Sequence, residues 1–170
     1  MTTVTHQPLA IAPHVLDGLR VRDDAGAVPV PYVHDLDGAP LRCCLRRSRA
    51  GERIALVSYA PLRRWAAAAG VDAGAYDETG PVFIHTGRCT GPKGVPGSPF
   101  AEAGALRAFR GYSGGGAIAG GAVVRVPDDP DRARTLVDQA LRTAFADPDV
   151  AFVHVRAADY GCFLYEVRRP

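Results

Sequence analysis

The most regular pattern of apolar and polar positions lies at residues 130–146. Apolar residues recur there at every third or fourth position: Ala133, Leu136, Val137, Ala140, Leu141, Ala144 and Phe145. This spacing predicts an amphipathic helix with one apolar stripe. Asp129 suits the N-cap, Pro130 suits the first helical position, and Pro148 cannot continue the helix. Because the stripe has to be covered, we expect the helix to pack on a sheet.

Several short β-type runs surround this helix, at residues 54–59, 82–85, 117–126, 150–156 and 162–168. A second, shorter helix is predicted at residues 61–69, with Gly70 at its end. The region before residue 45 suggests strands and turns, and a loop rich in Pro and Gly is expected at residues 90–99. Since the strands come in groups, the pattern predicts an α+β fold with a mostly antiparallel sheet, and the one main amphipathic helix (130–146) packed on one face.

The last two predicted strands form a hairpin around the short loop 157–161. If the hairpin closes symmetrically, Arg156 lies opposite Cys162, with His154 two positions away on the same face. Arg supplies a planar set of donors for carboxylate or phosphate, His changes charge near neutral pH, and Cys is a nucleophile if His lowers its pKa. The alternative is a half-solvated sheet face, on which Arg156 pairs with Glu166 and Cys162 is a small buried hydrophobe.

Composition and charge narrow the function classes. The length of 170 residues fits a single domain, 1–170. A net charge of +2 is too small to indicate binding to nucleic acid. No apolar run is long enough for a membrane span, and the N-terminus lacks the pattern of a signal peptide. We therefore expect a cytoplasmic protein without nucleic-acid or membrane partners, in which Cys43, Cys44, Cys89 and Cys162 are reduced thiols.

Three segments of the chain share a recognisable pattern. They read P-L-R-C-C-L at 40–45, Y-D-E-T-G-P-V-F-I-H-T-G-R-C at 76–89 and V-H-V-R-A-A-D-Y-G-C-F at 153–163. Together they resemble a bacterial family catalogued as domain of unknown function 1203, over about residues 39–169. The resemblance implies only that these blocks belong to one domain, and it maps onto Arg42, Cys44, Glu78, Gly80, Pro81, His85, Cys89, His154, Arg156, Tyr160, Gly161 and Cys162.

One departure from the family pattern concerns metal binding. The family has Cys where this chain has Leu41, so a C-x-x-C pair with Cys44 cannot form. A zinc site made of Cys44, His85, Cys89 and Cys162 remains an alternative, but the spacing of these residues is long and irregular. We therefore predict no metal and no cofactor.

The predicted function is the binding of a small anionic ligand. The site is expected near the ends of the 82–85 strand and the final hairpin, and its predicted residues are Arg42, His85, His154, Arg156, Tyr160 and Cys162. Arg156 would hold the anion, and His154 or His85 would donate or accept a proton. The alternative is a non-catalytic protein-interaction module, in which His85, His154 and Arg156 form a structural hydrogen-bond network. The sequence leaves open whether the protein is an enzyme and whether it forms a homodimer.

Overall fold

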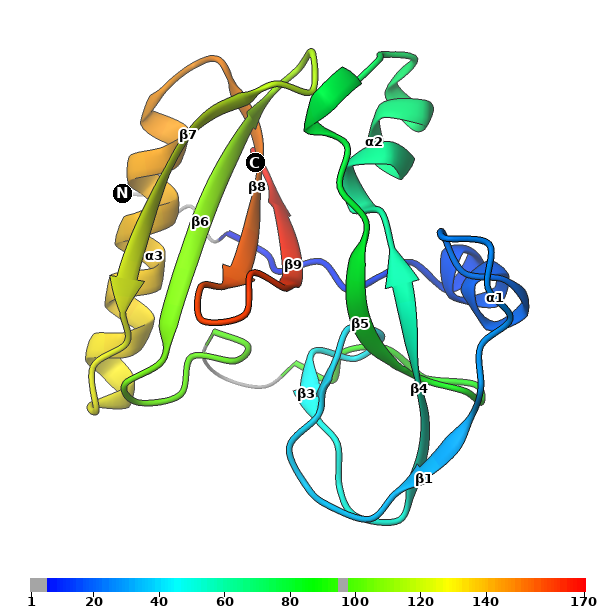
Figure 1. Cartoon of the computed structure of the whole chain (residues 1–170). Helices are drawn as coiled ribbons and strands as arrows, with labels where there is room; N and C mark the ends of the chain where they lie inside the picture. The colour runs from blue at the N-terminus through cyan, green and yellow to red at the C-terminus, as the bar shows by residue number, and fades with distance from the viewer. Residues whose placement is uncertain (1–5, 95–97) are drawn as a thin grey trace.

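The strands of the protein form two sheets (Figure 1). The computed structural model describes residues 6–94 and 98–170. The five-stranded sheet has the order β1-β4-β5-β2-β3, with β1 Tyr32–His34, β2 Pro40–Leu41, β3 Arg46–Arg47, β4 Glu52–Tyr59 and β5 Gly80–His85. The four-stranded sheet has the order β7-β6-β8-β9, with β6 Leu106–Ser113, β7 Ile118–Arg125, β8 Val150–Ala157 and β9 Phe163–Arg168.

The main helix, α3 (Pro130–Ala146), covers one face of the four-stranded sheet (Figure 1). The side chain of Asp129 caps it by accepting from the backbone N–H of Arg132 at 2.8 Å. Its stripe buries Val137, Leu141 and Phe145 against the inner face of β6, β8 and β9. The predicted helix bounds, its packing on a sheet and the α+β class are confirmed, because the apolar period and the flanking prolines are local signals.

Two features differ from the sequence-based expectation. The strands divide between two sheets and do not build one. The early region, predicted as strands and turns, also contains a helix, α1 (Pro13–Val21), whose Leu16 and Leu19 pack on the five-stranded sheet. The helix has only nine residues, so its apolar period is short and easily missed. The second predicted helix is present as α2 (Pro61–Ala69), followed by the short 3₁₀ turn η1 (Gly74–Tyr76).

One strand pair positions the candidate site. All named strand pairs are antiparallel except β2 and β5, which run parallel with Leu41 beside Phe83. Since parallel neighbours point the same way, the carboxyl ends of β2 and β5 meet at one edge of the sheet. The backbone N–H of Arg42 donates to the Phe83 carbonyl at 2.9 Å, which keeps the chain beyond β2 close to the end of β5.

The register of the C-terminal hairpin corrects the prediction made for it. A bulge between Val155 and Arg156 places Arg156 opposite Phe163, and His154 opposite Glu166. Arg156 is therefore not opposite Cys162, and the residues of β9 nearest the loop change faces relative to β8. Phe163 contacts the ring of His154, while Leu164 packs under α3. The sequence carries no clear signal for this bulge, because the predicted register and the observed one both leave apolar residues on the core face.

None of the helices in the described parts of the chain is long and apolar enough to cross a membrane.

Candidate functional site

A tight turn carries two adjacent thiols at the edge of the five-stranded sheet. Residues 42–45 connect β2 to β3, and the backbone N–H of Leu45 donates to the Leu41 carbonyl at 2.9 Å. Leu45 closes the turn with a positive φ of 55°, a conformation that costs energy for a residue with a Cβ. In this conformation the side chain of Leu45 is buried in the core beside α3. The turn places Cys43 and Cys44, both buried, beside the end of β5.

His85, the last residue of β5, lies against both thiols. Its Nδ1 is 3.3 Å from Cys43 Sγ and 3.9 Å from Cys44 Sγ. Its backbone N–H also donates to Cys43 Sγ, at 3.3 Å. Cys89 follows in the loop after β5, and one donor atom from each of Cys43, Cys44, His85 and Cys89 lies within 4.8 Å of all the others. We call these four residues the Cys/His cluster.

Glu52 holds the outer side of the His85 ring. Its Oε1 lies 3.4 Å from His85 Nε2, and both carboxylate oxygens accept from the Arg46 guanidinium, at 2.5 and 3.1 Å. The Arg46 hydrogen bond lowers the pKa of Glu52 to about 2, so the carboxylate stays ionised at neutral pH. An ionised carboxylate accepts the imidazole Nε2–H, which leaves the Nδ1 lone pair directed at the sulfur atoms.

The two neighbouring thiols differ in acidity. The hydrogen bond that Cys43 donates to Cys44 lowers the pKa of Cys44 to about 6, and the positive charge of Arg46 acts in the same direction. The same hydrogen bond and burial raise the pKa of Cys43. The cluster therefore contains a thiol, Cys44, whose pKa is lowered beside a cationic side chain, which is the setting of a metal-binding or reactive cysteine.

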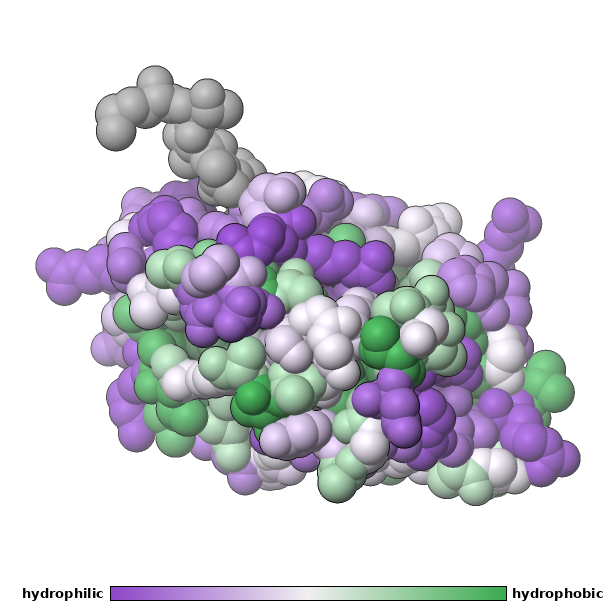
Figure 2. Space-filling view, turned by 90° about the horizontal axis from the view of Figure 1, so that it is seen from above, coloured by the Kyte–Doolittle hydropathy of each residue, from purple (hydrophilic) through white to green (hydrophobic). Residues whose placement is uncertain are grey.

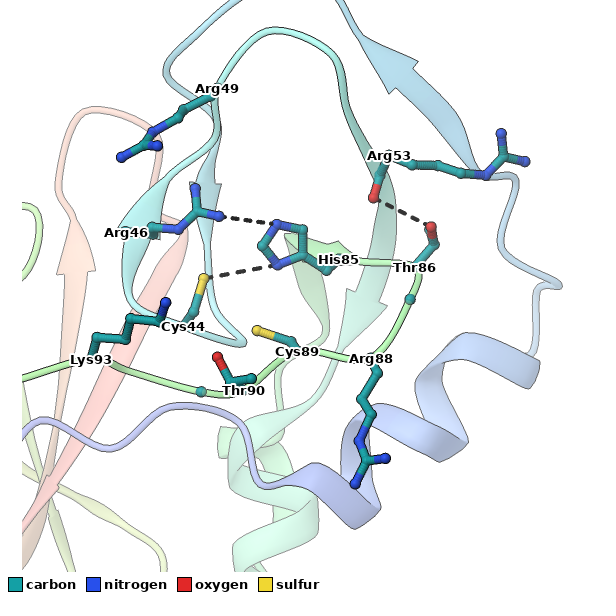
Figure 3. A pocket seen from close by; sticks show the side chains of 12 residues that line it. Cys44, Arg46, Arg49, Arg53, His85, Thr86, Arg88, Cys89, Thr90 and Lys93 are labelled. Atoms are coloured by element: carbon teal, nitrogen blue, oxygen red, sulfur yellow. Dashed lines mark hydrogen bonds between the residues drawn. The ribbon is translucent and has the colours of Figure 1, made fainter.

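The Cys/His cluster forms part of the wall of a basic pocket of about 840 Å³ (Figure 3). Arg46 and Lys93 point toward Cys44 and His85, whereas Arg53 and Arg88 extend outward from the rim (Figure 3). Among the described residues that line it there is no carboxylate, and the lining side chains include five cations: Arg46, Arg49, Arg53, Arg88 and Lys93. We call this cavity the basic pocket.

The structure does not bring all six predicted site residues into one pocket. Of the six, only His85 lies in the basic pocket. His154 is fully buried in an aromatic cage of Tyr112, Phe152 and Phe163. Burial lowers the pKa of His154, although Glu166, 3.3 Å from its Nε2, acts in the opposite direction. His154 is thus a neutral core residue at physiological pH.

The other four predicted residues lie outside the basic pocket. Arg156 pairs with Glu78 at 3.0 Å and donates to the Gly161 carbonyl. Arg42 is buried and donates to the carbonyl oxygens of Phe163 and Pro40, which ties the two sheets together. Tyr160 is exposed, and with Arg42 and Cys162 it lines a different cavity of about 660 Å³. The ligand-binding roles of these residues remain predictions.

The zinc alternative drawn from the sequence contains three of the four cluster residues, Cys44, His85 and Cys89, and misses Cys43. In place of Cys43 it names Cys162, which lies outside the cluster. A usable signal was present: four sulfur and imidazole donors occur within the first two family-like blocks, between residues 43 and 89. Three basic residues from the same part of the chain, Arg46, Arg49 and Arg53, line the same pocket.

Comparison with known proteins identifies the family. The model described as "Protein of unknown function (DUF1203)" matches residues 38–169, most of the chain. The chain therefore belongs to the DUF1203 family, as its three sequence blocks predicted. No match was found among curated proteins or solved structures.

Proposed function

We propose that this domain binds a small anionic ligand in the basic pocket. The observation that carries the proposal is the charge of the lining: five cationic side chains and no carboxylate among the described residues. Arg46 is paired with Glu52, which lies outside the lining, but the other four cations repel one another, and a bound anion would stabilise their gathering. The volume of about 840 Å³ is large enough for a phosphorylated or carboxylated metabolite.

Arg46 and Lys93 are the side chains best placed to hold the anion. Both point into the pocket beside Cys44 and His85 (Figure 3). Arg46 is held by Glu52 and therefore keeps its orientation without a ligand, whereas Lys93 reaches in from the loop that follows β5. A guanidinium and an ammonium that line one cavity suit an oxyanion such as phosphate or carboxylate.

The single lysine of the chain provides a direct test. Lys93 is the only Lys in the 170 residues, so an amine-reactive reagent modifies this side chain and the N-terminus alone. Inorganic phosphate and a panel of phosphorylated and carboxylated metabolites should slow modification of Lys93 and leave that of the N-terminal amine unchanged. Equal rates with and without every anion, at low ionic strength, would refute the proposal.

Matched variants locate the binding site. Lys93→Gln should weaken anion binding, measured by calorimetry, at least about tenfold, because one charged contact contributes roughly 1.5–3 kcal/mol. Arg134→Gln is the control, since Arg134 lies on α3 and its charge is the same. An equal loss in both variants would indicate a general charge effect and would count against this pocket.

The interaction-module hypothesis has less support. His85 and His154 belong to separate clusters, so the single His/Arg network that it required is divided. On the face seen from above, apolar residues lie in separate groups among hydrophilic ones (Figure 2).

A further inference from the structure

The Cys/His cluster has the spacing of a tetrahedral metal centre. A Zn–S bond of about 2.3 Å places the ligand atoms of a tetrahedron about 3.8 Å apart. Cys43 Sγ and Cys44 Sγ are 3.9 Å apart, Cys44 Sγ and His85 Nδ1 are 3.9 Å apart, and Cys43 Sγ and His85 Nδ1 are 3.3 Å apart. With Cys89 included, every pair of donor atoms lies within 4.8 Å. We propose that Cys43, Cys44, His85 and Cys89 bind one zinc ion.

The chemical types of the four donor atoms indicate which metal the cluster would bind. Three sulfur atoms and one imidazole nitrogen make a soft set that favours Zn²⁺ over the hard ions Mg²⁺ and Ca²⁺. Four protein ligands in tetrahedral positions are typical of a structural zinc site without an open position. Cys43 lies at the back of the site, buried, while Cys44, His85 and Cys89 line the basic pocket.

The surroundings of the donors also fit a zinc centre. Glu52 accepts from His85 Nε2, and a carboxylate on the distal nitrogen of a ligating imidazole fixes its tautomer and orientation. The backbone N–H of His85 donates to Cys43 Sγ and stabilises negative charge on that sulfur. Three thiolates and one Zn²⁺ leave a net single negative charge, and Lys93, which points toward Cys44, supplies a cation that offsets it.

The metal would account for the position of the loop after β5. Within the described part of that loop, residues 87–94, no hydrogen bond joins the chain to the rest of the protein. Cys89 is the residue of this segment that reaches the cluster. A zinc ion would therefore bond the loop to the turn between β2 and β3, two segments that no strand pairing connects directly.

Metal binding can be measured on the wild-type protein alone. Reduced protein stripped with a chelator is titrated with Zn²⁺ and Co²⁺ in buffer without phosphate or other coordinating anions. We expect one ion per chain, with Co²⁺ giving sulfur-to-metal charge transfer and the intense ligand-field bands of tetrahedral coordination. Absence of these bands together with no Zn²⁺ retained after gel filtration would overturn the proposal, as would a disulfide between cluster cysteines in freshly purified protein.

The fourth cysteine of the chain supplies a matched control. Cys43→Ser and Cys89→Ser should each lose the tetrahedral Co²⁺ spectrum, whereas Cys162→Ser should keep it because Cys162 lies outside the cluster. A full spectrum in both cluster variants, or its loss in Cys162→Ser, would overturn the assignment. The zinc site does not rest on the proposed anion binding, since the Co²⁺ spectrum reports the metal and Lys93 modification reports the anion.

Discussion

His85 Nδ1 lies 3.3 Å from the sulfur of Cys43, although the two residues are 42 positions apart in the sequence. The parallel pairing of β2 with β5 produces this contact, because each residue follows or ends a strand at the same edge. Around it lie the other two thiols of the cluster and the cations of the basic pocket.

Zinc should stabilise the wild-type protein against heat. A ligand present at 100 times its dissociation constant adds about 2.7 kcal/mol to the free energy of unfolding. For a chain of this size the melting temperature should rise by roughly 5–10 °C. Calorimetry of stripped and reloaded protein measures the shift. Cys162→Ser should show the same rise and Cys89→Ser none; an equal rise in both would place the ion elsewhere.

Removal of the carboxylate behind His85 should weaken metal binding without abolishing it. Glu52→Ala takes away the acceptor of the imidazole Nε2–H and frees Arg46 from its ion pair. Loss of such a supporting group typically lowers metal affinity about 10- to 100-fold. Competition with a chromogenic chelator gives the affinity. An unchanged affinity would show that the His85 ring is held in place by packing alone.

Stripping the metal should also weaken anion binding. Cys89 and Lys93 belong to the same loop, so release of Cys89 removes the constraint on the lysine side chain. We expect the protection of Lys93 by phosphate to fall severalfold in stripped protein and to return on reloading with Zn²⁺. If protection is the same in both states, the loop is positioned without the metal.

A variant of Arg156 distinguishes anion binding in the basic pocket from binding at the C-terminal hairpin, where the sequence predicted the site. Its guanidinium is occupied by Glu78 and by the Gly161 carbonyl. Arg156→Ala should leave the anion affinity unchanged and lower the free energy of unfolding by about 1–2 kcal/mol, from one lost hydrogen bond and one ion pair to an exposed carboxylate. Calorimetric titration and urea unfolding test the two parts. A large loss of anion affinity would favour a site at the hairpin.

His154 should make the protein less stable in mild acid. Burial lowers its pKa, so between about pH 6.5 and the lower folded value the unfolded chain binds the extra proton and the native state does not. Stability contributed by the neutral ring is therefore present above about pH 6.5 and lost as the pH falls. Glu166 opposes this shift, while Arg156 and Arg110 add to it.

The comparison variant for this pH effect is His154→Gln, whose amide can still donate toward Glu166. Urea unfolding of both proteins from pH 7.5 to 5.5 gives the free energies. The difference between the free energies of unfolding of the two proteins should change with pH in this range. His6 is also buried with a lowered pKa, but it is present in both proteins and contributes equally to both free energies. A constant difference would mean that the pKa of His154 is the same in the native and unfolded states.

Sequence pattern predicted the secondary structure better than the site. The bounds of α3 follow from its apolar period and its flanking prolines, and β4, β5, β8 and β9 follow from short apolar runs between turns. The hairpin register could not be predicted in the same way. His154 lies opposite Glu166 and not opposite Leu164, a shift of two residues along β9, while Tyr165 and Val167 still face the core. The bulge at Val155 and Arg156 then separates Cys162 from Arg156, and the aromatic cage encloses His154.

The sequence by itself determined the family, the α+β class and the thiol, imidazole and guanidinium groups available for chemistry, because these depend on local period and residue type. Only the tertiary structure decided which of those groups meet. Cys43 and Cys44 lie beside His85 because β2 and β5 pair in parallel, and no local sequence pattern predicts this pairing. His154, in contrast, lies inside an aromatic cage. Strand order and register arise from long-range pairing, whose stabilisation depends on how whole surfaces fit together.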